Sequence, residues 1–213
     1  MVKTTQTEKI RKMVLLTMLS AIVLVLQLTG FAIRIPVLGT PVSLVLIPIT
    51  LGAMLLGPAA GAWLGFLFGA EVYLVCGVMG TDPFTNFLFL DHPFATAAIC
   101  LVKSTLAGWV SGLIYQTLSK RKKTVSALLL ASAITPVINT GVFILGCLLI
   151  RDTLAGYMTS NGIAGSVIYF LIIGCAGINF LFEFAFSMIL APSLQRLLVV
   201  FGRKKIEVKN GKH

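Results

Sequence analysis

Long apolar segments alternate with short polar ones along this chain, which predicts a bundle of membrane-spanning helices. A helix needs about 20 predominantly apolar residues to cross the hydrocarbon core of a bilayer. The second predicted helix is short for a full crossing. It is joined to the third by Gly57 and Pro58, which predict a tight turn, because proline lacks an amide donor and glycine tolerates unusual backbone angles. The six predicted helices occupy residues 13–30, 43–56, 58–78, 94–118, 124–150 and 163–198.

Glycines recur at every fourth residue from that turn onward, at Gly57, Gly61, Gly65 and Gly69. This spacing predicts a groove without side chains, against which another helix packs closely. Glu71 follows two residues later, so it is turned about 200° away from the groove at roughly 100° per residue. A carboxyl group in an apolar helix is unfavourable in lipid, and it usually marks a partner, a cavity or a site.

The composition is typical of a membrane protein. Of the 213 residues, 57% are hydrophobic and 11% are charged, and the mean hydropathy is +0.99, whereas about 25% of the residues in soluble domains are charged. We therefore expect a single all-α membrane domain over residues 1–213, with a basic segment at 1–12 and a basic tail at 199–213. The phosphate-binding pattern GxxxxGK[ST] does not occur, which excludes nucleotide hydrolysis by that route.

The net charge is +10, but the positions of the positive residues indicate topology rather than nucleic-acid binding. Basic flanks of membrane spans mark the cytoplasmic side of the membrane. Lysines and arginines gather at residues 3–12, 120–123 and 196–212. An even number of spans puts all three of these clusters on one side, so we expect both termini in the cytoplasm of a multi-pass cell-membrane protein.

The same parity places the remaining connections outside the cell, at residues 31–42, 80–93 and 151–162. The first apolar segment is long and lacks a small-residue cleavage signature, so we interpret it as a retained span and not as a signal peptide.

Polar side chains inside the predicted helices are candidates for a ligand site. Glu71 and Lys103 lie in the outer half of the membrane region, where they form either a buried ion pair or part of a ligand cavity open to the outside, and the sequence leaves both possibilities open. Asn139 follows Pro136, which frees a backbone carbonyl, and an amide beside freed backbone suits a small polar ligand. The alternative at Asn139 is a structural kink that the amide repairs.

Asn179 and Glu183 are four residues apart and therefore share one face of the last helix. We expect Glu183 to lie deeper toward the cytoplasm, where a bond between helices or a contact with a partner protein competes with ligand binding.

Arg34, Asn86, Asp91 and His92 lie in or beside the predicted outer loops. An arginine there could capture the carboxylate or phosphate of an entering ligand, although such loop residues are more often simply solvated. A metal site is poorly supported, because the only other histidine is His213 in the tail. Nothing resembles the nucleophile elbow of a hydrolase, and the 4 dispersed cysteines, which form no C-x-x-C pattern, are interpreted as small buried hydrophobic residues.

The chain resembles the S-components of energy-coupling factor (ECF) transporters, which are substrate-capture subunits for vitamin uptake in prokaryotes. The resemblance rests on the predicted spans, the proline-bearing loop after the first, the short second helix and the segment LGAMLLGPAAGAWLGFLFG. It extends over residues 9–201. Its most specific parts are the G-P-x-x-G-x-x-x-G pattern that begins at Gly57 and the later ITPVINTGVFILG, which is closest to the branch that includes pantothenate subunits.

The resemblance implies a subunit that captures a water-soluble vitamin, best matched by pantothenate, without a cofactor and without enzymatic activity of its own. It implies as partners a membrane scaffold subunit and two ATP-hydrolysing subunits, and it implies that small residues at every fourth position of the first span pack on the scaffold. Thr17 and Ala21 keep that spacing, whereas Met13 and Val25 continue it with bulky side chains.

The resemblance also implies a ligand position near the outer side, under the first loop. A lysine or arginine there suits the carboxylate of pantothenate, and Asn139 suits its hydroxyl or amide groups. The substrate contacts implied in this chain are Arg34, Glu71, Asn86, Lys103, Asn139 and Asn179.

Other functions stay open at this point. The chain could be an S-component for another vitamin, such as riboflavin, cobalamin or folate. An intramembrane enzyme using Glu71, Asp91 or His92 would usually need clustered acids or a histidine pair, whereas the 7 acidic residues are dispersed. A stand-alone carrier often shows internal inverted repeats, and none is evident in this sequence.

Overall fold

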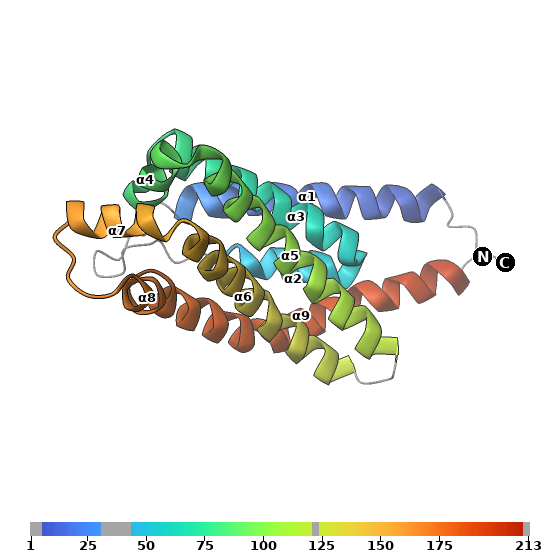
Figure 1. Cartoon of the computed structure of the whole chain (residues 1–213). Coiled ribbons are helices and arrows are strands. Elements are labelled where there is room, and N and C mark those ends of the chain that lie inside the picture. Colours follow the sequence, from blue (N-terminus) through green and yellow to red (C-terminus); the bar gives the residue numbers. More distant parts are fainter. Residues whose placement is uncertain (1–5, 31–43, 121–123, 211–213) are drawn as a thin grey trace.

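The chain folds as a bundle of helices in a computed structural model that describes residues 6–30, 44–120 and 124–210, and no strand occurs in these residues (Figure 1). The predicted all-α fold is therefore confirmed. Two stretches of π-helix are present: η1 (Val72–Val78) continues α3, and η2 (Phe170–Gly177) joins α8 to α9. The α-helices are α1 (Gln6–Gly30), α2 (Leu46–Leu56), α3 (Pro58–Glu71), α4 (Pro83–Asp91), α5 (Pro93–Lys120), α6 (Thr124–Leu149), α7 (Arg151–Ser160), α8 (Val167–Tyr169) and α9 (Ile178–Asn210).

Not every predicted span is long enough to cross a membrane. The helix α2 has 11 residues, which is about 16 Å at roughly 1.5 Å per residue, against a hydrocarbon core of about 30 Å. The predicted short limb is thus confirmed, whereas six full crossings are not shown. Among the described residues, the 5 segments of sufficient length and hydropathy are Gln6–Thr29, Pro58–Val78, Pro93–Lys120, Val125–Leu149 and Val167–Leu194.

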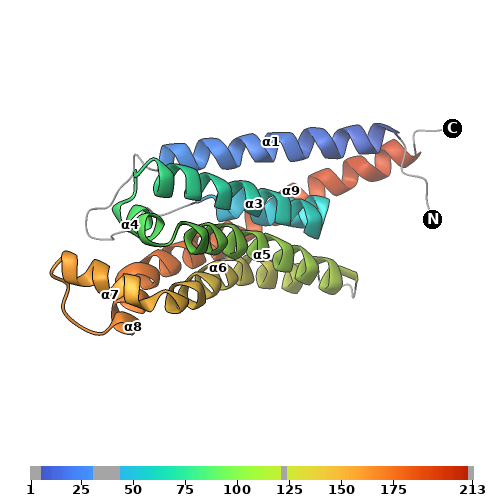
Figure 2. The same ribbon diagram turned by 45° about the horizontal axis from the view of Figure 1, so that its top comes forward.

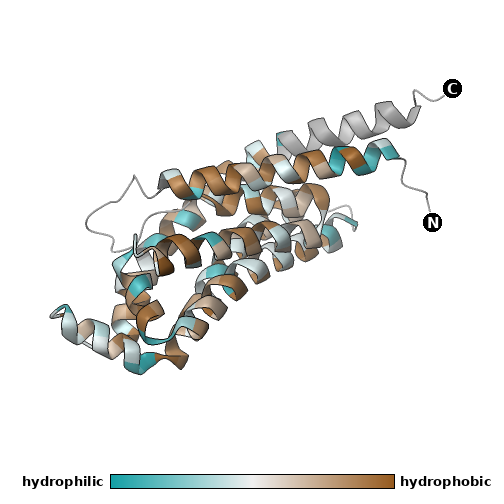
Figure 3. Ribbon diagram, turned by 90° about the horizontal axis from the view of Figure 1, so that it is seen from above, coloured by the Kyte–Doolittle hydropathy of each residue, from teal (hydrophilic) through white to brown (hydrophobic). Residues whose placement is uncertain are grey.

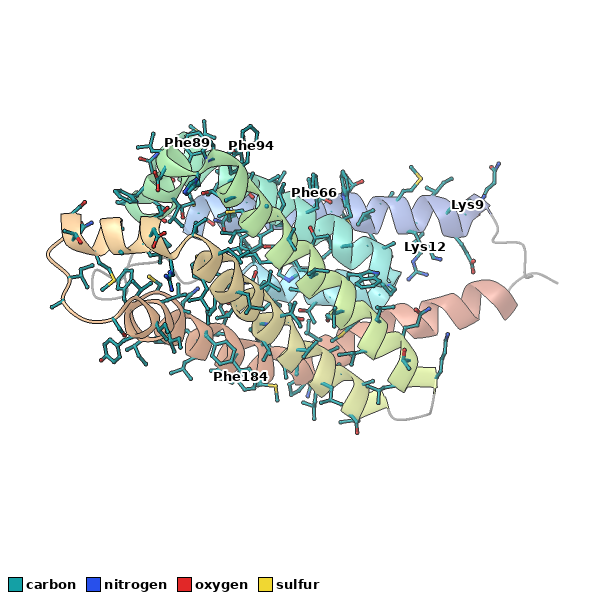
Figure 4. All side chains as sticks on the ribbon, in the orientation of Figure 1. Lys9, Lys12, Phe66, Phe89, Phe94 and Phe184 are labelled. Carbon is teal, nitrogen blue, oxygen red and sulfur yellow. The ribbon has the colours of Figure 1, made fainter. Side chains whose placement is uncertain are left out.

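The helix ends next to the basic clusters come together at one end of the bundle. The helix α1 begins there and α9 ends there, and the junction of α5 and α6 lies at the same end (Figures 1 and 2). Lys9 and Lys12 of α1 mark this end, which we call the basic end (Figure 4). These three helix ends lie at the same end of the bundle, as the charge pattern predicted. The assignment of this end to the cytoplasm stays a prediction.

The outer surfaces of the long helices are apolar. Most of their length is coloured as hydrophobic in Figure 3, whereas α7, at the end far from the basic end, is mostly pale or hydrophilic. Large side chains point outward along this surface: Phe94 is 90% exposed and Phe66 is 42% exposed, and Phe94 is seen at the margin of the bundle in Figure 4. Exposure of this kind fits a surface that faces lipid rather than water.

The predicted glycine groove is confirmed, and its partner is α5. Each of three glycines on α3 faces a backbone carbonyl of α5, and a Cβ atom added to the glycine would collide with that carbonyl. Gly57 lies outside this contact: its φ of +104° serves the turn between α2 and α3. We call the contact the small-residue seam; its pairs are Gly61 with Gly108, Gly65 with Ser104 and Gly69 with Cys100.

Candidate ligand-binding site

Lys103 places a positive charge inside the bundle. It lies on α5 and is half-buried, and its Nζ is 5.1 Å from the centre of the Phe143 ring on α6. A cation at this distance is attracted by the face of the ring. The salt bridges of the described residues do not include Lys103. Its ammonium group therefore has hydrogen-bond donors available for another partner.

Asn139 on α6 is linked to the residue next to Lys103. It is 6% exposed, and the hydroxyl group of Ser104 donates a hydrogen bond to its Oδ1 over 3.4 Å. Pro136 lies inside α6, and because proline has no amide hydrogen it frees the carbonyl of Ser132, four residues earlier. The helix nevertheless continues from Thr124 to Leu149, so the amide of Asn139 stays within the bundle.

The packing of α6 against α9 determines which residues of these helices lie at the same depth in the bundle. Ala131 and Ala191 belong to one apolar cluster, and Cys147 and Cys175 belong to another, nearer the end opposite the basic end. The helices run antiparallel (Figure 1), and the step of 16 residues from Ala131 to Cys147 is matched by a backward step of 16 from Ala191 to Cys175. Interpolation between these anchors places Asn139 at the depth of Glu183 and Phe143 at the depth of Asn179.

Asn179 and Glu183 share one face of α9, as the sequence predicted, and they bond to each other. The Nδ2 of Asn179 donates to the Oε1 of Glu183 over 3.3 Å. Glu183 is 3% exposed and lies within electrostatic reach of Lys103. The charge of Lys103 thus reaches Glu183. Glu183 also lies nearer the basic end than Asn179, since α9 ends there, and its position relative to the cytoplasm stays a prediction. We call Lys103, Asn139, Asn179 and Glu183 the polar cluster.

Four aromatic rings from four elements pack together beside Lys103: Phe84 of α4, Phe143 of α6, Tyr157 of α7 and Phe170 of η2. The ring centre of Phe84 is 5.2 Å from that of Tyr157 and 6.3 Å from that of Phe143. The Tyr157 and Phe170 ring centres are 6.0 Å apart. Sequence reasoning did not select these rings, because they are far apart in the chain and aromatic residues are spread throughout it.

Tyr157 also supplies a hydroxyl group to this region, outside the membrane-spanning helices. Burial raises the pKa of its phenol, and the negative charge of Asp82 contributes in the same direction. Both effects disfavour the phenolate. The phenol is therefore neutral at physiological pH and is able to donate a hydrogen bond.

Glu71 does not join the polar cluster. It follows Leu64 and Phe68 on the α3 face that packs in a core cluster with Leu19 and Val23 of α1, on the side of α3 turned away from the small-residue seam. It is 7% exposed, and neither carboxyl oxygen has a hydrogen-bond partner among the residues that the structure describes. Those residues include no ion pair between Glu71 and Lys103.

The other predicted polar residues near the outer loops are engaged in local contacts. The Nδ2 of Asn86 donates to the carbonyl of Gly77 over 2.7 Å, which ties α4 to η1. Asp91 accepts a hydrogen bond from the hydroxyl group of Thr153 on α7, and its Oδ2 is 3.7 Å from the Nε2 of His92. Arg34 lies outside the described residues.

The cysteines are buried, as predicted. Over residues 6–30, 44–120 and 124–210, no group of three or more histidine, cysteine, aspartate and glutamate side chains is arranged to hold a metal ion.

Thr17 and Ala21, the predicted scaffold contacts, both lie on the exposed face of α1. The hydroxyl group of Thr17 donates to the carbonyl of Met13 over 3.0 Å, so it is satisfied within its own helix. The two residues border a hollow of about 520 Å³, which is lined by Ile10, Met13, Val14, Thr17, Met18 and Ala21. The surface of α1 is thus shallowly indented at the small residues.

Comparison with known proteins gave one match. The family model described as "ECF transporter, substrate-specific component" matches residues 11–195, a range that contains the whole polar cluster and both predicted scaffold contacts. No curated protein sequence and no solved structure matched the chain.

Proposed function

The chain belongs to the family of ECF transporter substrate-specific components, and from this premise we propose that it captures pantothenate from outside the cell. A member of this family is the substrate-binding membrane subunit of an ECF importer. The pantothenate assignment is finer than the family match: it comes from the resemblance of the segment ITPVINTGVFILG to the pantothenate branch, and the chemistry of the polar cluster supports it.

The observation that supports the proposal most is the cation inside the bundle. Lys103 lies over Phe143 and forms no salt bridge with another described residue. Pantothenate is a small acid with an amide and hydroxyl groups. Its carboxylate would take charge-assisted hydrogen bonds from Lys103, and its amide and hydroxyl groups match the donors and acceptors of Asn139 and Asn179.

The position of Lys103 fits entry from outside. It lies 10 residues after the first residue of α5, a helix of 28 residues that ends at the basic end. If the basic end faces the cytoplasm, as the charge pattern predicts, Lys103 lies in the outer half of the membrane. Arg34, Glu71 and Asn86 stay predicted substrate contacts, with Arg34 as the residue that would first meet the carboxylate.

We place the scaffold subunit on α1. Thr17 and Ala21 provide small side chains on an exposed face, and the hollow beside them would receive side chains of a partner helix. ATP hydrolysis, for which this chain lacks the phosphate-binding pattern, is assigned to two partner subunits.

The proposal is tested on protein purified in detergent. Mass spectrometry identifies small molecules that co-purify, and titration calorimetry measures the affinities for pantothenate, riboflavin, cobalamin and folate. We expect saturable binding of pantothenate, and uptake into liposomes only when the scaffold and ATPase subunits are present with ATP. Binding of none of these vitamins would overturn the proposal, and uptake by the chain alone would identify a stand-alone carrier.

A further inference from the structure

The α9 side of the polar cluster has two oxygen atoms without a hydrogen bond. They are the Oδ1 of Asn179 and the Oε2 of Glu183, both buried, and no described residue donates to either. Buried polar atoms in folded proteins are nearly always hydrogen-bonded. These two therefore mark a place where a donor other than the described residues is needed.

We propose that Asn179 and Glu183 form the hydrogen-bond-accepting end of the ligand site, and that the substrate places a hydroxyl, amide N–H or ammonium group against them. This proposal rests on the proposed function and adds Glu183 to the residues that contact the substrate. It also defines the substrate class: an acid that carries a hydrogen-bond donor at the end opposite its acidic group.

The geometry fixes which atoms are available. The Nδ2 of Asn179 already donates to the Oε1 of Glu183 over 3.3 Å, so this bond orients both groups and leaves the amide oxygen and the second carboxyl oxygen as acceptors. An amide oxygen and a carboxylate oxygen accept hydrogen bonds and do not donate them. Two adjacent acceptors held in place by one bond form a preorganised receptor for a donor.

The site combines groups of opposite character from different helices. Asn139 lies at the depth of Glu183 and Phe143 at the depth of Asn179, while Lys103 approaches from α5 over the Phe143 ring. Lys103 donates hydrogen bonds and carries positive charge, whereas the α9 pair accepts hydrogen bonds. A substrate with an acidic group at one end and a donor at the other matches both. A dicarboxylate does not match, because its second carboxylate would face Glu183.

The first test compares Glu183→Gln with wild type by calorimetric titration with pantothenate. The substitution keeps the shape of the side chain but replaces one carboxyl oxygen with a donating NH2 group. We expect binding at least about tenfold weaker, because a charge-assisted hydrogen bond is lost. Ser187→Ala is the matched control: Ser187 is buried one turn further along the same face of α9, and we expect its removal to leave the affinity unchanged.

The second test changes the ligand and needs no variant. Pantothenate analogues that lack one hydroxyl group are titrated into the wild-type protein, and we expect at least one of them to bind about tenfold more weakly. The same analogue should lose little affinity on Glu183→Gln, since the acceptor is already gone.

The outcomes separate this inference from the proposed function. Wild-type protein that binds none of the vitamins overturns both. Wild-type protein that binds pantothenate, with equal affinity for Glu183→Gln and for every deoxy analogue, overturns only the role of Glu183 and Asn179. If Glu183→Gln does not purify as a monodisperse protein, the analogue series on wild type alone tests the role of Glu183 and Asn179.

Discussion

Two antiparallel helix contacts in this bundle are built from opposite kinds of residues. In the small-residue seam, Gly61, Gly65 and Gly69 bring the backbone of α3 against the backbone of α5. In the contact between α6 and α9, Asn139 and Phe143 lie at the depths of Glu183 and Asn179, and two oxygen atoms of the α9 pair lack a partner within the described chain.

The difference indicates that the two contacts have different roles, one structural and one in ligand binding. A contact made by glycines gains close packing and presents few polar side chains, so it is satisfied by the chain itself and holds the bundle together. A contact made by amide and carboxyl side chains is unfavourable in lipid unless every group is paired. Because the α6–α9 contact is not fully paired, it suits a bound ligand, and Lys103 on α5 adds the complementary charge.

The largest effect on stability is expected from a substitution that fills the small-residue seam. Gly65→Ala would place a Cβ atom against the carbonyl oxygen of Ser104, and because backbone cannot move aside as a side chain does, we expect a loss of about 1–3 kcal/mol in the free energy of unfolding. Chemical unfolding in a fixed detergent measures the change.

The matched control for the seam is Gly141→Ala on α6. An alanine Cβ there meets no described atom within 4 Å, so the substitution should be neutral or stabilise by about 0.5–1 kcal/mol through helix propensity. Equal effects of the two substitutions would show that the seam is not closely packed.

A smaller effect is expected at the polar cluster. Asn139→Ala removes a buried amide at the depth of Glu183 and leaves Ser104 without its side-chain acceptor. We expect the dissociation constant for pantothenate to rise about fivefold, the equivalent of about 1 kcal/mol for one neutral hydrogen bond. Calorimetry checks this against Asn161→Ala, whose exposed side chain donates only to Tyr157 in its own turn.

The smallest effect is expected where the chain satisfies its own polar groups. Thr50 on α2 donates to Thr135 on α6 over 2.9 Å, and Thr50→Val should cost about 1 kcal/mol of stability or less, with no change in ligand affinity. Thr29→Val is the control, because its exposed hydroxyl group bonds only within α1. A drop in affinity for Thr50→Val would extend the ligand site toward α2.

The seam and the pairing of Asn179 with Glu183 could be predicted because each depends on spacing within one helix. Glycines four apart share a face whatever the neighbour is, and so do two polar residues four apart. What spacing does not give is the partner helix, so the sequence did not show that α5 would fill the groove.

For the same reason, the sequence could not decide whether Glu71 pairs with Lys103. Glu71 and Lys103 were matched by depth along the membrane, but depth says nothing about the direction in which a side chain points. Glu71 lies on the α3 face that packs against α1, whereas Lys103 lies over the Phe143 ring of α6, and the charge of Lys103 reaches Glu183. The aromatic group beside Lys103 has members in four elements, which no local pattern connects.

The most direct test of the whole account is the affinity of Lys103→Met for pantothenate, measured by titration calorimetry beside wild type. Methionine keeps a flexible apolar stem on the Phe143 ring and removes only the charge. The account predicts binding about 10–100-fold weaker, because a hydrogen bond from a charged group contributes about 1.5–3 kcal/mol, with unchanged binding by Lys120→Met at the exposed end of the same helix. Wild-type affinity in a folded Lys103→Met protein would contradict it.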